Sequence, residues 1–352
     1  MDPILLTVFI PSYNRSERLE IALKWLISEI VDLNLASKIA VLVGDNGSVD
    51  QTPDICQKAL ELARSKGVTF DYFRNETNLG FSGNIEAGCI RVNSNWMMLV
   101  SDDDTLCHGS LGVVCSDLEE YKPSIAIYNF AQPPYSFSNP LIKETILIRR
   151  ELDYSDLSTI VSWPKMTGVT FEVPYLKGNP EKIHKICKIS NHFPQVTIAM
   201  AISQTANVLL KSSTFIGQPD DDYLDHVNFV PYIGEYLIKE MKDFQFAFDS
   251  DSNSLRQLSL EIPRTNILDS SVSVLISFYR GKTKLTVRVK RRMINNLVRY
   301  LWRNKTTYDG LVLDKPKRLF WLKCCLLVLL MTKHALLLRL TGERLQLMPD
   351  AF

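Results

Sequence analysis

The first hundred residues alternate short apolar runs with longer amphipathic stretches. Four runs are rich in β-branched and large apolar side chains, as is typical of buried strands: residues 5–10, 39–43, 68–73 and 96–100. The stretches between them predict three helices, over about residues 17–30, 52–67 and 81–92. Strands that alternate with helices predict right-handed crossovers. We therefore expect an α/β fold with a doubly wound, mainly parallel sheet and helices on both faces.

The pattern after residue 110 is mixed, and it places elements only loosely. It predicts helices at residues 111–121 and 193–204 and strands at residues 124–130 and 168–173. Residues 131–140 are expected to form a loop, because proline, serine and asparagine dominate them. Past residue 265 the chain is expected to be mostly helical.

A polar segment follows each of the four predicted strands, at residues 11–15, 44–48, 74–80 and 101–104. Ligands of open α/β sheets bind beyond the carboxyl ends of the strands. All four segments are therefore expected at one edge of the sheet, which makes that edge the predicted site.

Three adjacent carboxylates, Asp102, Asp103 and Asp104, follow the fourth predicted strand. Like charges this close repel one another, and a cation would relieve the repulsion. Hard oxygen ligands favour Mg²⁺ or Mn²⁺, which take part of their shell from substrate phosphates. The alternative is a solvated acidic turn before the next helix.

Two further segments suit a nucleotide. The sequence Asp45-Asn46-Gly47-Ser48 offers a carboxylate and an amide for a nucleobase edge or a ribose, although a plain Asx turn has the same composition. Residues 78–84 offer backbone N–H groups at a helix N-terminus, which can bind a diphosphate or serve only as a helix cap.

Four motifs in order resemble the family 2 glycosyltransferases with the GT-A fold, over about residues 4–115. They are Phe9-Ile-Pro-Ser-Tyr-Asn-Arg15, Asp45-Asn-Gly-Ser-Val-Asp-Gln-Thr52, Asn78-x-Gly80-x-x-x-Asn84 and Ser101-Asp-Asp-Asp-x-Leu-x-x-Gly-x-Leu111. Residues 167–171 and 191–196 resemble the second half of O-antigen sugar transferases such as abequosyltransferase. The resemblance implies a nucleotide-sugar-binding half (residues 1–115), an acceptor-binding half (116–260) and a helical basic and apolar C-terminal region (261–352).

The resemblance also implies the roles of individual residues. Pro11, Tyr13, Asp45 and Asn46 would line the nucleoside pocket, and the aspartate cluster would bind ribose and metal. The matching motif positions complete the nucleotide-sugar set with Asn14, Ser48, Asn78, Gly80, Asn84 and Asp102. Two registers of the metal motif stay open, Asp103 with Asp104 or Asp102 with Asp104, and Asp103 is favoured as the principal ligand.

The implied reaction moves a sugar from a nucleoside diphosphate to an acceptor hydroxyl, with inversion at the anomeric carbon. Many family members carry a Glu-Asp pair that supplies the base, but residues 191–196 contain no carboxylate. His192 is the candidate base, Asp220, Asp221 and Asp222 are its rivals, and a packed or surface histidine is the alternative.

Charge is divided unevenly along the chain. Residues 280–352 contain 17 Lys and Arg against 4 Asp and Glu, and residues 1–279 contain 23 against 35. Residues 319–340 are strongly apolar, but Lys323, Lys333, His334 and Arg339 interrupt them, which argues against a spanning helix. We expect an interfacial helix on anionic lipid, on the inner face of the cytoplasmic membrane, with a lipid-linked glycan as acceptor. A helix packed on the catalytic domain is the alternative.

The cysteines bear on the compartment of the protein, and two functions rival that of a glycosyltransferase. The seven cysteines form no C-x-x-C pair, which favours a reducing cytoplasm over a disulfide framework or zinc site. The segment 11–15 is not the glycine-rich phosphate loop of a nucleotidyltransferase, and no nucleic-acid partner is expected. A catalytically inert nucleotide-sugar-binding or membrane scaffold protein remains open, because no carboxylate base is evident.

Overall fold

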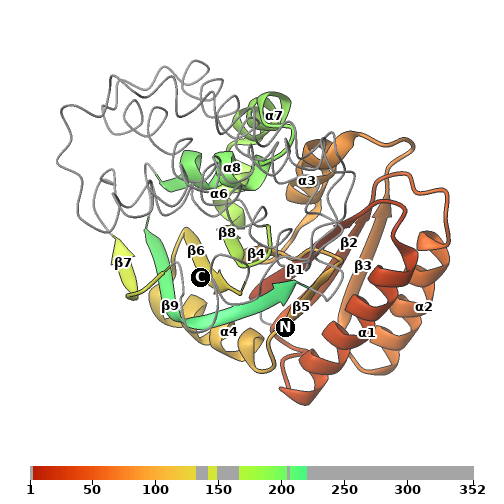
Figure 1. Cartoon of the computed structure of the whole chain (residues 1–352), viewed down its shortest axis with the longest axis horizontal. Helices are drawn as coiled ribbons and strands as arrows, with labels where there is room; N and C mark the ends of the chain where they lie inside the picture. The colour runs from red at the N-terminus through yellow and green to blue at the C-terminus, as the bar shows by residue number, and fades with distance from the viewer. Residues whose placement is uncertain (1–2, 132–141, 149–165, 204–206, 220–352) are drawn as a thin grey trace, which may run out of the picture. The chain divides into compact units, whose positions relative to one another are not determined.

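Figure 1 shows the computed structural model of the chain, which describes residues 3–131, 142–148, 166–203 and 207–219. Internal contacts divide the chain into two compact units. All described residues belong to the unit formed by Met1–Asp222 and Tyr236–Pro263. The predicted boundaries near residues 115 and 260 stay predictions.

The first half of the fold agrees with the pattern of the sequence. All four predicted strands and all three predicted helices are confirmed, with ends that differ by no more than a few residues. The strands are β1 (Leu6–Ser12), β2 (Ile39–Asp45), β3 (Thr69–Arg74) and β4 (Trp96–Leu99), and the helices are α1 (Ser16–Asp32), α2 (Thr52–Ser65) and α3 (Gly80–Arg91).

The second half contains more elements than the sequence predicted. Four predicted elements are confirmed: α4 (Ser110–Tyr121), β6 (Ile125–Phe130), β8 (Val169–Glu172) and α8 (Pro194–Ser203). Five were not predicted: β5 (Asp104–Leu106), β7 (Ile146–Ile148), α6 (Val173–Gly178), α7 (Pro180–Ile189) and β9 (Val208–Pro219).

The strands form one sheet in the order β3-β2-β1-β4-β8-β6-β9-β5, and β7 pairs with β9. The strands β1 to β4 are parallel, and β9 is parallel to β6. The strand β8 runs antiparallel to β4 and β6, and β5 and β7 run antiparallel to β9. The prediction of a mainly parallel sheet therefore holds for the first half only, and the whole sheet is mixed.

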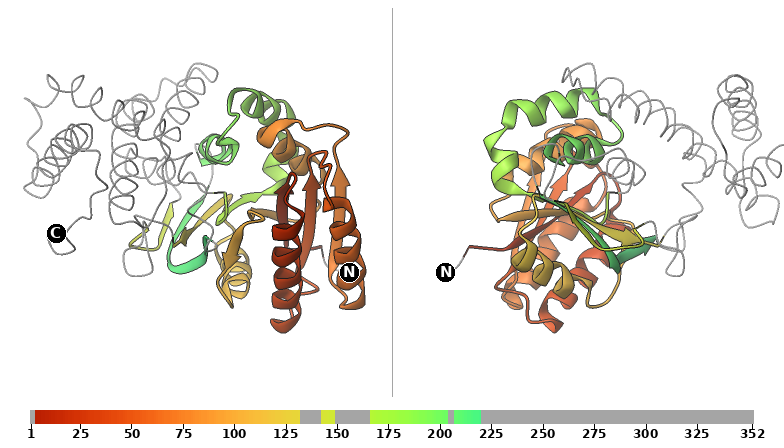
Figure 2. Two further views of the ribbon diagram at one scale, coloured as in Figure 1. Left: turned by 45° about the vertical axis from the view of Figure 1, so that its right-hand side comes forward. Right: turned by 90° about the vertical axis from the view of Figure 1, so that its left-hand side faces the viewer.

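The direction of the crossovers decides which helices share a face. From β1 through β2 to β3 the chain moves one way along the sheet, so right-handed crossovers place α1 and α2 on one face. From β3 to β4 it returns past β1, so α3 lies on the opposite face, with α6, α7 and α8 (Figures 1 and 2). The reversal creates a topological switch point between β1 and β4, the place where such sheets bind ligands.

Tight packing fixes α3 against the sheet. Every residue of β1 and β2 is buried, as expected for strands covered on both faces. A Cβ atom on Gly88 of α3 would lie 2.2 Å from the ring of Phe9, so only glycine allows this approach.

Among the described residues, no helix is long and apolar enough to cross a membrane.

Candidate active site

The carboxyl ends of three neighbouring strands lie level with one another. The sheet register pairs Ser12 of β1 with Asp45 of β2, and Asp45 with Arg74 of β3. Asp102 follows β4 on the other side of β1, and the Ser12 hydroxyl donates a hydrogen bond of 2.7 Å to its Oδ2. The structure thus brings the predicted segments to one edge of the sheet, at the switch point.

Two carboxylates of the cluster, Asp102 and Asp103, share an arginine partner. Asp102 is 3% exposed, and its Oδ1 accepts a hydrogen bond of 2.8 Å from Nη1 of Arg15. The same Nη1 lies 3.0 Å from Oδ2 of Asp103. Nη1 of Arg18 approaches that Oδ2 at 3.5 Å, and the Ser101 hydroxyl donates to Oδ1 of Asp103. One guanidinium therefore bridges two adjacent carboxylates.

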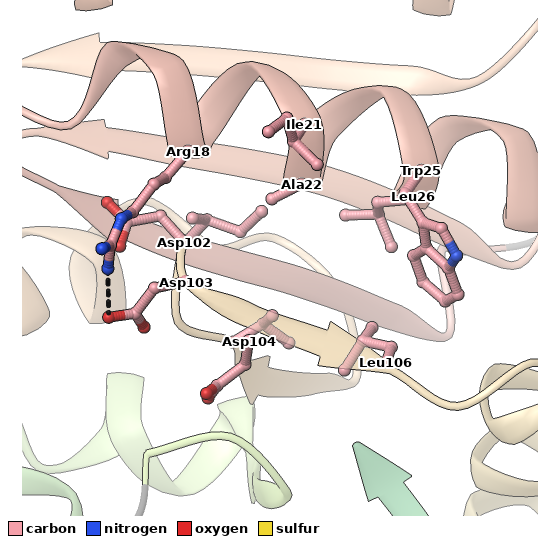
Figure 3. Close-up of a pocket in the computed structure, with 11 residues that line it drawn as sticks. Arg18, Ile21, Ala22, Trp25, Leu26, Asp102, Asp103, Asp104 and Leu106 are labelled. Atoms are coloured by element: carbon pink, nitrogen blue, oxygen red, sulfur yellow. Dashed lines mark hydrogen bonds and ion pairs between the residues drawn. The ribbon is translucent and has the colours of Figure 1, made fainter. Parts of the chain in front are cut away.

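The third carboxylate belongs to the far side of the cluster. Asp104 is buried, and the Thr167 hydroxyl donates a hydrogen bond of 2.5 Å to its Oδ2. The Thr167 oxygen also accepts the Ser101 N–H at 2.9 Å. Figure 3 shows Asp103 pointing toward Arg18, whereas Asp104 turns away from it. The segment before β8 therefore holds the loop that carries the cluster.

Burial and charge compete at Arg15 and Asp102. Burial lowers the pKa of Arg15, but the charges of Asp102 and Asp103 outweigh it and hold that pKa above its ordinary value. Burial raises the pKa of Asp102, and Arg15 and Ser12 oppose this effect. The charged state of each group therefore depends on the other.

The predicted nucleoside side of the site centres on Asp45, which has no exposed surface. Its Oδ1 accepts the Ser48 N–H at 2.8 Å, and its Oδ2 accepts the Tyr72 hydroxyl at 3.1 Å. Nε of Arg74 lies 3.3 Å from the same Oδ2, and Nη2 of Arg74 donates to the Ser48 carbonyl at 2.7 Å. Burial, together with the charge of Asp45, raises the pKa of Tyr72. Asp45 is thus a fully buried carboxyl group that ties Ser48, Tyr72 and Arg74 together in the wall of the site.

Buried amides hold the loops at this edge together. Nδ2 of Asn46 donates to Oδ1 of Asn78 at 2.7 Å and to the Gly80 carbonyl at 2.9 Å. Oδ1 of Asn46 accepts from the Leu79 N–H at 2.9 Å and from Asn75 at 3.1 Å. These contacts give Asn46 and Asn78 a positioning role. Asn75 belongs to the same set of hydrogen bonds, although the pattern of the sequence did not single it out.

A second amide joins the start of α3 to the end of β2. Nδ2 of Asn84 donates to the Gly44 carbonyl at 2.7 Å. A Cβ atom on Gly44 would lie 2.9 Å from Oδ1 of Asn84, so the two residues are in close contact. Asn84 therefore also acts through the position of a loop, since its amide is buried.

One carboxylate joins the beginnings of α1 and α2. Oδ2 of Asp50 accepts the Ser16 N–H at 2.9 Å, and Oδ1 accepts the N–H of Thr52 at 3.0 Å and its hydroxyl at 2.6 Å. Burial acts to raise the pKa of Asp50, but these hydrogen bonds outweigh it and lower the pKa to about 2. Asp50 therefore caps both helices that approach the site.

The remaining predicted residues occupy different surroundings. Pro11 is buried within β1, whereas Tyr13 is 41% exposed at the edge of the sheet. Asn14 has a positive φ of 52°, its N–H donates to the Ser48 hydroxyl at 2.9 Å, and its Oδ1 accepts the Val49 N–H at 2.8 Å. The loops after β1 and β2 are therefore tied to each other, with Tyr13 facing outward.

The candidate base is His192. It is half-buried two residues before α8, and its ring centre lies 6.5 Å from that of Phe193. Residues 220–222, the rival source of the base, lie outside the described residues, as do residues 280–352.

The residues that the structure describes form no ready-made metal site. The cysteines of the described residues, Cys56, Cys89, Cys107, Cys115 and Cys187, are free. Burial raises the pKa of Cys56, Cys89 and Cys115 to about 12, so these thiols are protonated at neutral pH. Within the described ranges, no three His, Cys, Asp or Glu side chains form a group that could hold a metal ion. The oxygens of the cluster are the right donors for Mg²⁺ or Mn²⁺, but arginines already contact two of the three carboxylates.

Comparison with known proteins gives a family match and several similar folds. Residues 7–171 match the family model described as glycosyl transferase family 2. No curated protein sequence matches the chain. Among solved structures, Staphylococcus aureus TarS 1–349 in complex with UDP has a TM-score of 0.55 at 16% identity, covering 98% of this chain and 95% of that chain.

Two further structures carry sugar nucleotides. The complex of S. aureus TarS 1–349 with UDP-GlcNAc has a TM-score of 0.54 at 16% identity, covering 85% of this chain and 81% of that chain. The mannosyltransferase PcManGT from Pyrobaculum calidifontis, in complex with GDP-Man and Mn²⁺, has a TM-score of 0.50 at 12% identity, covering 98% and 90% of the two chains. At these identities the likeness concerns the fold.

The mixed sheet, with helices on both faces and polar loops at its switch point, defines an α/β domain of the GT-A type. Residues 7–171 match the model of glycosyl transferase family 2. The finer resemblance to abequosyltransferase is not confirmed.

Proposed function

We propose that this protein is a glycosyltransferase that moves a sugar from a nucleoside diphosphate to a hydroxyl of a glycan acceptor. One observation carries the proposal. In a chain with a family 2 segment, Asp102, Asp103 and Asp104 directly follow β4, at the switch point beside the end of β1. A charged cluster that is partly buried at such a point is typical of a binding site.

The donor would lie along the edge formed by the loops after β1, β2 and β4. Tyr13, Asp45 and Ser48 are proposed to bind the nucleoside, and Asp102 the ribose. Pro11, Asn14, Asn46, Asn78, Gly80 and Asn84 would shape that pocket through the contacts described above. The solved structures of similar fold hold UDP, UDP-GlcNAc or GDP-Man, which supports a nucleoside-diphosphate donor without fixing its base or sugar.

A divalent cation, Mg²⁺ or Mn²⁺, is proposed as cofactor. Asp103 and Asp104 would hold it, because Asp103 is more exposed than Asp102, at 15% against 3%. When bound, the cation would supply positive charge beside the leaving diphosphate. The solved structure of the mannosyltransferase PcManGT contains Mn²⁺, which supports this choice.

The proposed reaction is a direct displacement with inversion. The acceptor oxygen forms a bond to the anomeric carbon while the bond from that carbon to the diphosphate oxygen breaks, and a base takes the hydroxyl proton. His192 is the proposed base, since it lies half-buried at the beginning of α8. Asp220, Asp221 and Asp222 are the rival candidates.

The acceptor is proposed to be a lipid-linked glycan, with residues 280–352 held on the inner, anionic face of the cytoplasmic membrane. Their excess of Lys and Arg and the interrupted apolar run support this location. The contrasting possibility is an inert nucleotide-sugar-binding or membrane scaffold protein. Such a protein would bind a sugar nucleotide without transferring or hydrolysing it.

The experiment that tests the function compares the Asp103→Asn variant with the wild type. We expect transfer and slow donor hydrolysis to fall at least about 10²-fold, the usual effect of losing one electrostatic contact to the developing charge. The Asp71→Asn variant is the control, because Asp71 is exposed on β3. Full activity in Asp103→Asn would contradict the assignment, and absence of turnover by the wild type on every sugar nucleotide would favour the inert protein.

A further inference from the structure

Arg15 occupies an unusual position for a cation. It immediately precedes α1, and its side chain is 38% exposed. The positive end of a helix dipole disfavours a positive charge there. The bridge from its Nη1 to Asp102 at 2.8 Å and to Asp103 at 3.0 Å compensates this cost. The guanidinium is therefore held by the aspartate cluster itself.

The arginines beside the aspartate cluster reduce its net negative charge. Two arginines, Arg15 and Arg18, contact two of the three carboxylates, Asp102 and Asp103, so much of the negative charge is already countered inside the protein. Arg15 is the stronger partner of this pair of carboxylates, since it lies 2.8 Å from Asp102 and 3.0 Å from Asp103, whereas Arg18 lies 3.5 Å from Asp103. A divalent cation that approaches this cluster meets a positive charge within a few ångströms of its ligands.

Arg15 also acts on the choice of ligands. Both oxygens of Asp102 accept hydrogen bonds within the protein, from Arg15 and from Ser12. Both oxygens of Asp103 also accept hydrogen bonds, so the two carboxylates differ in exposure and not in being engaged. Asp103 is the more exposed of the two bridged carboxylates, at 15% against 3%. All three carboxylates line the pocket in Figure 3, and of the bridged pair Asp103 is the one more open to an incoming cation.

We propose that Arg15 is a positioning residue that acts as a built-in counter-charge: it keeps Asp102 out of the ligand set and keeps the affinity of the free cluster for a divalent cation low. This inference rests on the proposed function. The diphosphate of a donor would bring the missing negative charge and further oxygen ligands. Cation and nucleotide then bind together, and by linkage each raises the affinity for the other by the same factor.

The test is a titration of the full chain with Mn²⁺ alone, in which binding is measured by calorimetry or electron paramagnetic resonance. We expect the Arg15→Gln variant to bind Mn²⁺ about tenfold more tightly than the wild type, since a unit charge is removed a few ångströms from the cation. The Arg15→Lys variant should keep the wild-type affinity. An Arg64→Gln variant, which loses an exposed charge on α2, is the control. If Arg15 had a purely structural role, the Arg15→Gln variant would bind Mn²⁺ more weakly than the wild type, because a disordered cluster binds the ion less well.

A second variant covers the case in which Arg15→Gln does not fold. The Arg18→Gln variant leaves the bridge between Asp102 and Asp103 in place and should also tighten Mn²⁺ binding, by a smaller factor. Unchanged or weaker binding in the variants that fold overturns the inference.

Titrations that include UDP or GDP separate the two claims. If the wild type binds Mn²⁺ with a nucleotide but Arg15→Gln binds Mn²⁺ no more tightly than the wild type, only the role of Arg15 fails. If neither protein binds Mn²⁺ under any of these conditions, both the role of Arg15 and the proposed cation cofactor are contradicted.

Discussion

In the described site, the Arg15 guanidinium bridges the carboxylates of Asp102 and Asp103. Removing one partner of a buried ion pair leaves the other charge unpaired at low dielectric. This usually costs more free energy of folding than replacing both partners by apolar side chains. Charges of this kind persist where they serve binding or catalysis, since apolar side chains of similar size would stabilise the fold as well. At the scale of single residues, the cluster is therefore better explained by function than by stability.

His192 is the residue whose role is easiest to test. If it is the base, the His192→Ala variant should lose about 10²–10⁴-fold in kcat, because proton transfer in the transition state is worth that much. The His184→Ala variant removes a half-exposed histidine that contacts Glu86 between α7 and α3, so its kcat should stay near that of the wild type. A loss of less than about tenfold in His192→Ala would assign the base elsewhere, with residues 220–222 next to be tested.

At the scale of elements, Asp50 couples α1 and α2 at the edge of the site. The Asp50→Ala variant should lower the free energy of unfolding by about 1–2 kcal/mol, because the N–H groups of Ser16 and Thr52 lose their acceptor. Chemical unfolding of the full chain measures this difference. The Glu61→Ala variant, on the exposed side of α2, should change it by no more than about 0.5 kcal/mol.

The effect of Asp50 should also depend on pH. Its pKa is about 2 in the folded chain, against an ordinary value of 3.8. A lowered pKa stabilises the fold above the unfolded value and loses that effect as pH falls through the folded value. The difference between wild type and Asp50→Ala should therefore be full above about pH 4 and shrink toward pH 2. A difference that stays constant over this range would show that the carboxylate charge is not involved.

The sequence predicted elements well where the pattern is local and regular. Strands β1 to β4 are uninterrupted apolar runs, and α1 to α3 have helical spacing, so each could be recognised alone. The strand β9 could not, because Lys211, Ser212, Ser213 and Thr214 interrupt it and its pairing with β6 shifts register between Tyr128 and Phe130. Pro174, Gly178 and Pro180 resembled loop residues, yet two short helices begin or end there.

The site was predictable to a similar degree. The carboxylates were found because they follow strands, and the rule for ligand binding in α/β sheets placed them at one edge. Their partners depend on which strands become neighbours, so the bonds from Arg15 to Asp102 and from Thr167 to Asp104 span 87 and 63 residues. The bond from Gly109 N–H to buried Glu29, which ties the loop after β5 to α1, spans 80 residues and was missed for the same reason.

At the scale of the whole molecule, the separation of charge suggests how the chain meets its acceptor. Residues 280–352 have a net charge of about +13 and the remainder about −12. Each basic residue near an anionic surface contributes about 1 kcal/mol, and apolar side chains add to the binding. Such a segment would keep the catalytic domain close to substrates that stay in the membrane.

Co-sedimentation of the full chain with vesicles tests this location. Binding should require anionic lipid and weaken as salt rises. Changing Arg291, Arg292, Lys317 and Arg318 to Gln should reduce it strongly. The control removes the same charge from the exposed residues Lys24, Lys58, Lys66 and Lys188, and should bind as the wild type does. Equal binding to neutral and anionic vesicles at every salt concentration would contradict an electrostatic anchor.

The binding of a sugar nucleotide at the strand edge underlies every other proposal, and a thermal-shift panel measures it directly. Wild type and Asp45→Ala are each heated with Mn²⁺ and UDP-, GDP-, CDP- or dTDP-sugars. A ligand that binds only the folded state raises Tm by mass action. We expect one nucleoside class to raise the Tm of the wild type, and the rise to shrink markedly in Asp45→Ala. No rise with any of the four classes, or an equal rise in both proteins, would contradict the proposed donor site.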